Sequence, residues 1–160
     1  MDMDSSYSAR REVISTGLKV TRILCVDDHA LLREGIAALV NAESDMRVVA
    51  EAANGQQVIE LFRLQRPDVT LMDLQMPGLN GIEASIGIRS EFSNARIIVL
   101  TTYSVDVQVL RALRALARAY VLEGQVHREL LDTIRAVHAG QKRIPPRSPR
   151  SWLTMPRMTT

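Results

Sequence analysis

Three aspartates stand where carboxylate chemistry is possible. Asp27 and Asp28 directly follow the run Ile23–Val26, and Asp73 directly follows Val69–Met72. Both runs are typical of buried strands, and parallel strands bring their carboxyl ends to one edge of a sheet. Carboxylates gathered there raise one another's proton affinity unless a cation is present. Oxygen ligands of this kind suit Mg²⁺ better than zinc.

Asp73 is the candidate nucleophile. Pro77 and Gly78 demand a turn a few residues after it, and Gly81 lets the chain enter the next helix at close quarters. Such a turn leaves Asp73 at the sheet edge, where a carboxylate beside Mg²⁺ can attack phosphorus and form an aspartyl phosphate. Thr101 follows another apolar run, and its hydroxyl could donate to a phosphoryl oxygen.

Structural interpretations compete for single residues of this group. Asp28 is also a candidate helix cap, a common role for an aspartate after a strand. His29 adjoins the acidic pair, and we interpret it as a residue at the start of a helix near the pocket mouth rather than as a ligand. A role as a helix cap accounts for one of the three aspartates more easily than for all three.

Five short apolar runs alternate with five amphipathic stretches between residues 22 and 140. The predicted strands are Ile23–Val26, Arg47–Ala52, Val69–Met72, Arg96–Leu100 and Ala119–Leu122. The predicted helices are Ala30–Asn41, Gly55–Gln65, Gly81–Phe92, Val105–Ala115 and Arg128–Ala139. This alternation predicts a doubly wound α/β sandwich around a parallel sheet.

Length and composition fit one globular domain with some tail. The chain has 160 residues, of which 46% are hydrophobic and 24% charged. The apolar run Ile36–Val40 is far too short to cross a bilayer, and the first residues lack the pattern of a secretory signal. The single cysteine, Cys25, excludes an internal disulfide and a multi-cysteine zinc site. A cytoplasmic location is expected.

The formal charge of +2 is unevenly distributed. Residues 141–160 contain five basic and no acidic side chains, which leaves a net charge of −3 for residues 1–140. We therefore expect a flexible leader over 1–20, a folded domain over 21–140 and a basic Pro/Arg/Ser tail over 141–160. The basic character belongs to the tail and is poor evidence that the folded body binds nucleic acid.

Four stretches of the sequence resemble a known family. They read ILCVDDHALLREGIAALV, VTLMDLQMPGLNGIEA, ARIIVLTTYS and ARAYVLEG, and lie within about three quarters of the chain, from about Arg22 to Gly140. Their order and spacing resemble bacterial two-component response-regulator receiver domains of the NarL/FixJ (LuxR-type) subfamily. The resemblance implies a three-layer αβα sandwich of the flavodoxin-like class, with a five-stranded parallel sheet in the order 2-1-3-4-5.

The resemblance also implies roles for individual residues. Asp73 would be the phospho-acceptor, Thr101 the switch hydroxyl and Tyr120 the switch aromatic, although Tyr120 could equally be a core tyrosine. A Mg²⁺ site would be formed by Asp27, Asp28, Asp73 and the backbone carbonyl of Gln75. The protein would catalyse at most its own phosphorylation and dephosphorylation, not turnover of a separate substrate.

The implied partners follow the family. A sensor histidine kinase would donate the phosphoryl group, and a homodimer is expected as one mode of assembly. Such phosphoproteins control transcription through a helix-turn-helix domain, for which residues 141–160 are too short, so DNA binding would require a C-terminal domain missing here. The tail itself has two interpretations: a frameshift product, because residues 146–153 match an out-of-register reading of a common family continuation, or a basic arm that binds nucleic acid without sequence preference.

Two residues depart from the family pattern. Glu123 stands where the family has a lysine that pairs with phosphoryl oxygens, and neither lysine of the chain, Lys19 or Lys142, lies in the matching stretches. An opposite charge about 4 Å away contributes roughly 4 kcal/mol at an effective dielectric constant of 20, and a like charge costs about as much. The alternative function is therefore a pseudo-receiver, or dimerisation module, that does not respond to phosphate. Leu116 replaces a glycine that commonly ends the fourth helix, which predicts a strained cap or a shifted helix end.

Two other functions on similar sheets fit less well. A flavin site would need a loop that cradles phosphate, whereas Asp27 and Asp28 would repel it. An aspartate-based phosphatase needs a second acid two residues after the nucleophile, and that position is Gln75.

Overall fold

A computed structural model of the chain describes residues 19–76, 78–101 and 107–143. The predicted leader, apart from its last two residues, and the tail beyond residue 143 lie outside this part. The elements are β1 (Thr21–Val26), α2 (Ala30–Asn41), β2 (Met46–Ala52), α3 (Gly55–Gln65), β3 (Val69–Asp73), α4 (Gly81–Glu91), β4 (Ile97–Thr101), α5 (Val107–Leu116), β5 (Ala119–Leu122), the 3₁₀ turn η1 (Glu123–Gln125) and α6 (Val126–His138). The alternation of strands and helices is confirmed.

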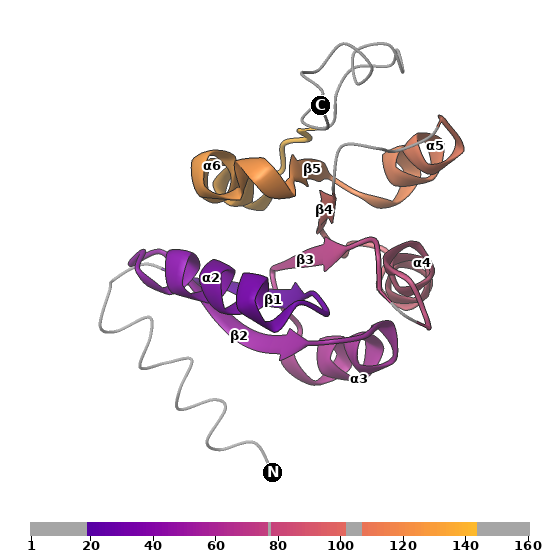
Figure 1. The fold of residues 1–160 in the computed structure, drawn as a ribbon, viewed down its shortest axis with the longest axis horizontal. Helices are drawn as coiled ribbons and strands as arrows, with labels where there is room; N and C mark the ends of the chain where they lie inside the picture. Colours follow the sequence, from indigo (N-terminus) through magenta and orange to yellow (C-terminus); the bar gives the residue numbers. More distant parts are fainter. Residues whose placement is uncertain (1–18, 77, 102–106, 144–160) are drawn as a thin grey trace.

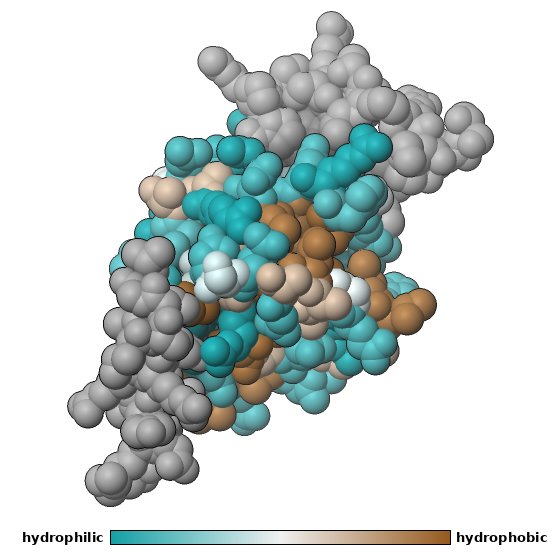
Figure 2. Space-filling model, turned by 90° about the vertical axis from the view of Figure 1, so that its left-hand side faces the viewer, coloured by the Kyte–Doolittle hydropathy of each residue, from teal (hydrophilic) through white to brown (hydrophobic). Residues whose placement is uncertain are grey.

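The five strands form one parallel sheet in the order β2-β1-β3-β4-β5, as predicted. Helices α3, α4 and α5 cover one face of the sheet, and α2 and α6 cover the other (Figure 1). The outer surface on the α2/α6 side is largely hydrophilic, with apolar side chains showing between the helices (Figure 2). Among the described residues, no helix has the length and apolar content needed to cross a membrane.

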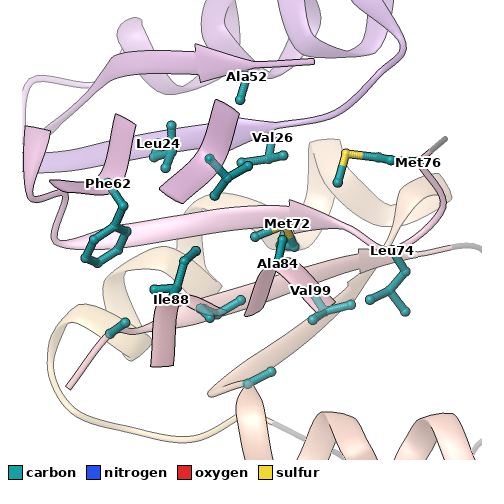
Figure 3. Close-up of a cluster of buried hydrophobic side chains, with 14 of the residues drawn as sticks. Leu24, Val26, Ala52, Phe62, Met72, Leu74, Met76, Ala84, Ile88 and Val99 are labelled. Atoms are coloured by element: carbon teal, nitrogen blue, oxygen red, sulfur yellow. The ribbon is translucent and has the colours of Figure 1, made fainter. Parts of the chain in front are cut away.

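The inner strands are buried on both faces, which explains their continuous apolar runs. Every residue of β3 and β4 is buried. Along β1, Leu24 and Val26 join the core under α3 and α4, whereas Ile23 and Cys25 join the core under α2 and α6. Figure 3 shows Leu24 and Val26 among the side chains of the first core. Two apolar layers thus fix the sheet and, with it, the strand ends.

In the described part of the chain, every predicted element boundary lies within two residues of the observed one. The last helix begins at Val126 rather than Arg128, because η1 turns the chain directly after β5. The fourth helix runs to Leu116, one residue beyond the predicted end, while the predicted first residues Val105 and Asp106 lie outside the described part. Leu116 is not among the described residues with positive φ, so the strained left-handed cap is not found there.

The chain continues past Gly140 along the free edge of β5. The amide of Arg143 donates to the carbonyl of Arg118 (2.8 Å), and Arg143 forms a parallel bridge with Ala119. The first residues of the predicted tail therefore contact the sheet.

Candidate functional site

Three carboxylates meet at the carboxyl edge of the sheet. Asp27 follows β1, and Asp73 is the last residue of β3, the strand that pairs with β1. One ligand atom each from Asp27, Asp28, His29 and Asp73 lies within 4.8 Å of the others. The structure thus brings together the three acids singled out in the sequence and adds a histidine.

Backbone contacts fix the two aspartates that end the strands. The Asp27 amide donates to the carbonyl of Ala52 (3.0 Å), and one carboxylate oxygen of Asp27 accepts from the amide of His29 (2.8 Å). On the other strand, Asp73 Oδ1 accepts from the amide of Gln75 (3.2 Å). In each case the turn after the strand directs the carboxylate into the site through a local hydrogen bond.

Two glycines allow the loop after Asp73 to close tightly. Gly78 adopts φ 76°, in the left-handed region, as the predicted turn requires. A Cβ at Gly81 would overlap the carbonyl oxygen of Asp73 and lie 2.8 Å from Cα of Leu74. Any side chain at position 81 would therefore push α4 away from the residue that carries the candidate nucleophile.

The carboxylates of the site are buried and lie close to other negative charges. Asp27 is fully buried and Asp73 is 2% exposed. Burial, followed by the charge of Asp27, raises the pKa of Asp73 to about 7, against the lowering effect of the hydrogen bond from Gln75. Asp27 Oδ2 and Asp73 Oδ2 have no hydrogen-bond partner within the described part of the chain. Two buried carboxylate oxygens without partners fit a hard cation such as Mg²⁺.

His29 lies closer to the acids than the sequence interpretation assumed. It is the N-cap residue of α2, as expected for the start of a helix, and the interpretation of Asp28 as the cap is wrong. His29 Nδ1 lies 3.3 Å from Asp27 Oδ1 and 3.2 Å from Asp28 Oδ1. The hydrogen bond to Asp27, followed by the charge of Asp28, raises the pKa of His29, which is exposed at the rim of the site.

Glu123 contributes a further negative charge. It is half-buried in the first position of η1, directly after β5. Burial raises the pKa of Glu123, the charges of Asp27 and Asp28 raise it further, and His29 opposes them. Lys19 precedes β1 and Lys142 follows α6, at the far ends of the described chain.

Thr101 and Tyr120 lie on neighbouring strands beside the acids. Thr101 ends β4 and is 2% exposed, while Tyr120 lies on β5 with its ring buried. Burial raises the pKa of the Tyr120 phenol, and a side-chain hydrogen bond with Thr101 lowers it in part. The two residues predicted to act together therefore lie on neighbouring, paired strands.

Two charged residues beside the site were not singled out from the sequence. Arg33 on α2 donates to the carbonyl of Asp27 (2.6 Å) and to the carboxylate of Glu51 on β2 (3.0 Å). The spacing of Arg33 on α2 carried no signal, since arginine on an amphipathic helix is usually a solvated residue. Only the packing of α2 over β1 and β2 shows its contact with Asp27.

Comparisons with known proteins agree with this geometry. Residues 23–135 match the family model of the response regulator receiver domain. The chain is 42% identical over 120 residues to the Bacillus subtilis protein named uncharacterized transcriptional regulatory protein YxjL, and 38% identical over 119 residues to the Escherichia coli nitrate/nitrite response regulator protein NarL. These alignments cover 75% and 74% of the chain and 55% of each relative, so the chain spans about half the length of these curated relatives.

A solved structure supports the same assignment. The crystal structure of a LuxR-family two-component response regulator from Aurantimonas sp. superposes with a TM-score of 0.74 at 38% identity. The match covers 80% of this chain and 91% of that one. The similarity therefore extends over about four fifths of this chain.

Proposed function

Because this chain belongs to the response regulator receiver family, we propose that it accepts a phosphoryl group on Asp73 in a two-component phosphorelay. The observation that carries the proposal is the meeting of Asp27, Asp28 and Asp73 at one sheet edge, with buried carboxylate oxygens left unpaired in the described chain. Structural carboxylates are normally paired when they are buried, so this arrangement indicates a site for a cation and a transferred group.

The residues present fit a magnesium site. Asp27, Asp28, Asp73 and the backbone carbonyl of Gln75 would hold Mg²⁺, whose positive charge offsets repulsion among the carboxylates and the incoming phosphoryl oxygens. In the transfer, an oxygen of the ionised Asp73 carboxylate attacks phosphorus while the bond from phosphorus to the histidine nitrogen of the donor breaks. The leaving imidazole takes up a proton from solvent.

The neighbouring side chains act on the product of this transfer. We propose that the Thr101 hydroxyl donates to an oxygen of the phosphorylated Asp73, which requires Thr101 to change its present interaction with Tyr120. Tyr120 would then adjust its position on β5. In this way the state of Asp73 reaches the surface formed by α5, β5 and α6.

The partners and the output follow the family. A sensor histidine kinase is the proposed phosphodonor, a homodimer the proposed assembly, and the cytoplasm the proposed location. Control of transcription is proposed from the names of relatives that are about twice as long as the aligned region. That output would require a DNA-binding domain linked to the receiver.

Phosphorylation can be tested directly by intact mass spectrometry. The full chain is incubated with a small phosphodonor, such as acetyl phosphate, with and without Mg²⁺. The expected result is a Mg²⁺-dependent gain of one phosphoryl group, which is absent in Asp73→Asn. A gain that persists in Asp73→Asn would place the chemistry elsewhere and refute the proposal.

A second candidate function rests on Glu123. Its carboxyl replaces the ammonium group expected to pair with the phosphoryl oxygens, and its charge acts on Asp27, Asp28 and Asp73. A pseudo-receiver would keep the fold and the partner surfaces without responding to phosphate. Glu123→Lys separates the two functions: if the natural chain takes up no phosphate and Glu123→Lys does, the pseudo-receiver is correct, whereas uptake by both supports the phosphorelay receiver.

A further inference from the structure

Arg33 joins three elements behind the acidic site. Its backbone amide donates to the carbonyl of His29 (3.0 Å), which places Arg33 at the end of the first turn of α2. From there its guanidinium reaches the carbonyl of Asp27 at the end of β1 and the carboxylate of Glu51 on β2. The Arg33 side chain is 20% exposed and that of Glu51 42%, so the link lies at the surface.

These contacts complete the fixation of Asp27. The peptide group before Asp27 is held through its amide by Ala52, and the peptide group after it is held through its carbonyl by Arg33. The carboxylate accepts from His29 through Oδ1, while Oδ2 lies buried without a partner in the described chain. The backbone of Asp27 is thus fixed on both sides, which leaves Oδ2 as the carboxylate oxygen available to a ligand.

Glu51 in turn fixes Arg33. Residues Cys25 and Glu51 are partners in the β1–β2 register, so Glu51 projects from the strand beside Asp27. A guanidinium has several donors in a rigid plane, which lets Arg33 serve the carboxylate and the carbonyl at once. A lysine has one ammonium group and could not hold the same two acceptors in the same geometry.

The guanidinium of Arg33 also brings positive charge to the end of β1. Arg33 contacts the carbonyl of Asp27 rather than its carboxylate, so it adds positive charge without occupying an oxygen that a metal would use. It therefore leaves the oxygens of the Asp27 carboxylate free.

We propose that Arg33 is a positioning residue of the acidic site: by holding the Asp27 carbonyl and Glu51 together, its guanidinium presents Asp27 Oδ2 to the cation. The inference rests on the proposed magnesium-dependent function and extends it to residues outside the aspartates. Partners that orient ligands in this way typically change metal affinity ten- to hundredfold when they are removed.

The test is calorimetric titration of Mg²⁺ into the full metal-free chain. Arg33→Gln should weaken Mg²⁺ binding about tenfold or more. Arg33→Lys should show an intermediate loss of affinity, because lysine keeps the positive charge but lacks the planar guanidinium with its several donors. Glu51→Gln should show a smaller loss, because it loosens Arg33 without removing it. The matched control is Arg63→Gln. Arg63 is an exposed arginine on α3 that binds both carboxylate oxygens of Glu91 on α4, and its replacement should leave the Mg²⁺ affinity unchanged.

Thermal unfolding in EDTA separates positioning from a purely structural role. A structural role alone would lower the melting temperature of Arg33→Gln and leave the Mg²⁺ affinity of the folded protein at its original value; that result would overturn the inference. Arg33→Lys and Glu51→Gln give the same test if Arg33→Gln does not fold. The proposed function fails separately, when the natural chain binds Mg²⁺ but gains no phosphoryl group.

Discussion

Two carboxylate clusters of this molecule have opposite electrostatic surroundings. At the α2/α6 side, Arg135 binds Asp45 through Nε (2.9 Å) and Glu43 through Nη2 (2.6 Å), and its hydrogen bond lowers the pKa of Asp45. At the sheet edge, Asp73 lies among other acids and has its pKa raised to about 7. The same residue type is paired with an arginine in one place and lies mainly among other carboxylates in the other.

The contrast distinguishes a structural ion pair from a functional site. The Arg135 cluster joins α6 to the loop before β2, and its partners are all partly exposed, so it contributes little to stability. The acidic edge costs stability in the absence of a cation, because buried like charges repel. A protein retains such a destabilising arrangement where the unpaired groups take part in its function.

The largest expected effect is that of Asp27→Asn on metal binding. The substitution removes one charge and one buried ligand oxygen, so Mg²⁺ affinity should fall by more than the roughly ten- to hundredfold typical of an indirect partner. Calorimetric titration measures it, with Asp45→Asn as the matched control because Asp45 already has a cation. Equal losses in both variants would show that the two clusters do not differ as described.

Magnesium itself should stabilise the fold. A ligand present at 100 times its Kd, bound only by the folded state, adds about 2.7 kcal/mol to the free energy of unfolding. Urea unfolding with and without Mg²⁺ measures this gain, which should disappear in Asp27→Asn. An equal gain in that variant would mean that Mg²⁺ binds away from the acidic edge.

The third prediction concerns pH. Since the pKa of Asp73 is raised on folding, ionisation of Asp73 costs stability as pH rises from about 4 to about 7. In EDTA at pH 8, Asp73→Asn should therefore be more stable than the natural chain, by about 1–2 kcal/mol after allowance for solvent screening. The difference should shrink as pH falls and vanish below about pH 4, where Asp73 is protonated in the folded and the unfolded chain alike. A constant difference across this range would exclude charge repulsion as its cause.

The smallest effect is expected at the paired cluster. Arg135→Gln should lower the free energy of unfolding at pH 7 by about 1 kcal/mol or less, because its partners are partly exposed. The pKa of Asp45 is lowered on folding, so this contribution is present above the ordinary aspartate pKa and is lost as pH falls through the folded value. Denaturation in 1 M salt should reduce the effect further, whereas a loss of several kcal/mol would mean that the cluster is effectively buried.

The positions of the acids at the strand ends could be predicted from the sequence. The turns and caps that surround these acids could be predicted only in part. The buried runs before Asp27 and Asp73 and the turn residues Gly78 and Gly81 define a parallel sheet with acids at one edge, because each signal is local. The sequence left Asp28 open as a candidate cap of α2, and the structure has His29 there, since the choice depends on how the chain leaves β1. The turn η1, which begins at Glu123, also gave no sequence signal.

Long-range contacts account for the remaining differences. Arg33 lies 18 residues from Glu51, and Arg135 lies 90 residues from Asp45. No periodicity along the chain couples residues so far apart, and both arginines fit the polar side of an amphipathic helix.

The order of apolar runs, turn glycines and three aspartates in this sequence determines the class of fold and the edge at which the acids lie, because hydrophobic burial and backbone sterics act over short stretches of chain. The tertiary structure decides which acids pair with an arginine and which remain available to a metal ion. Charge interactions depend on distance through space and on burial, and both exist only after the helices have packed on the sheet.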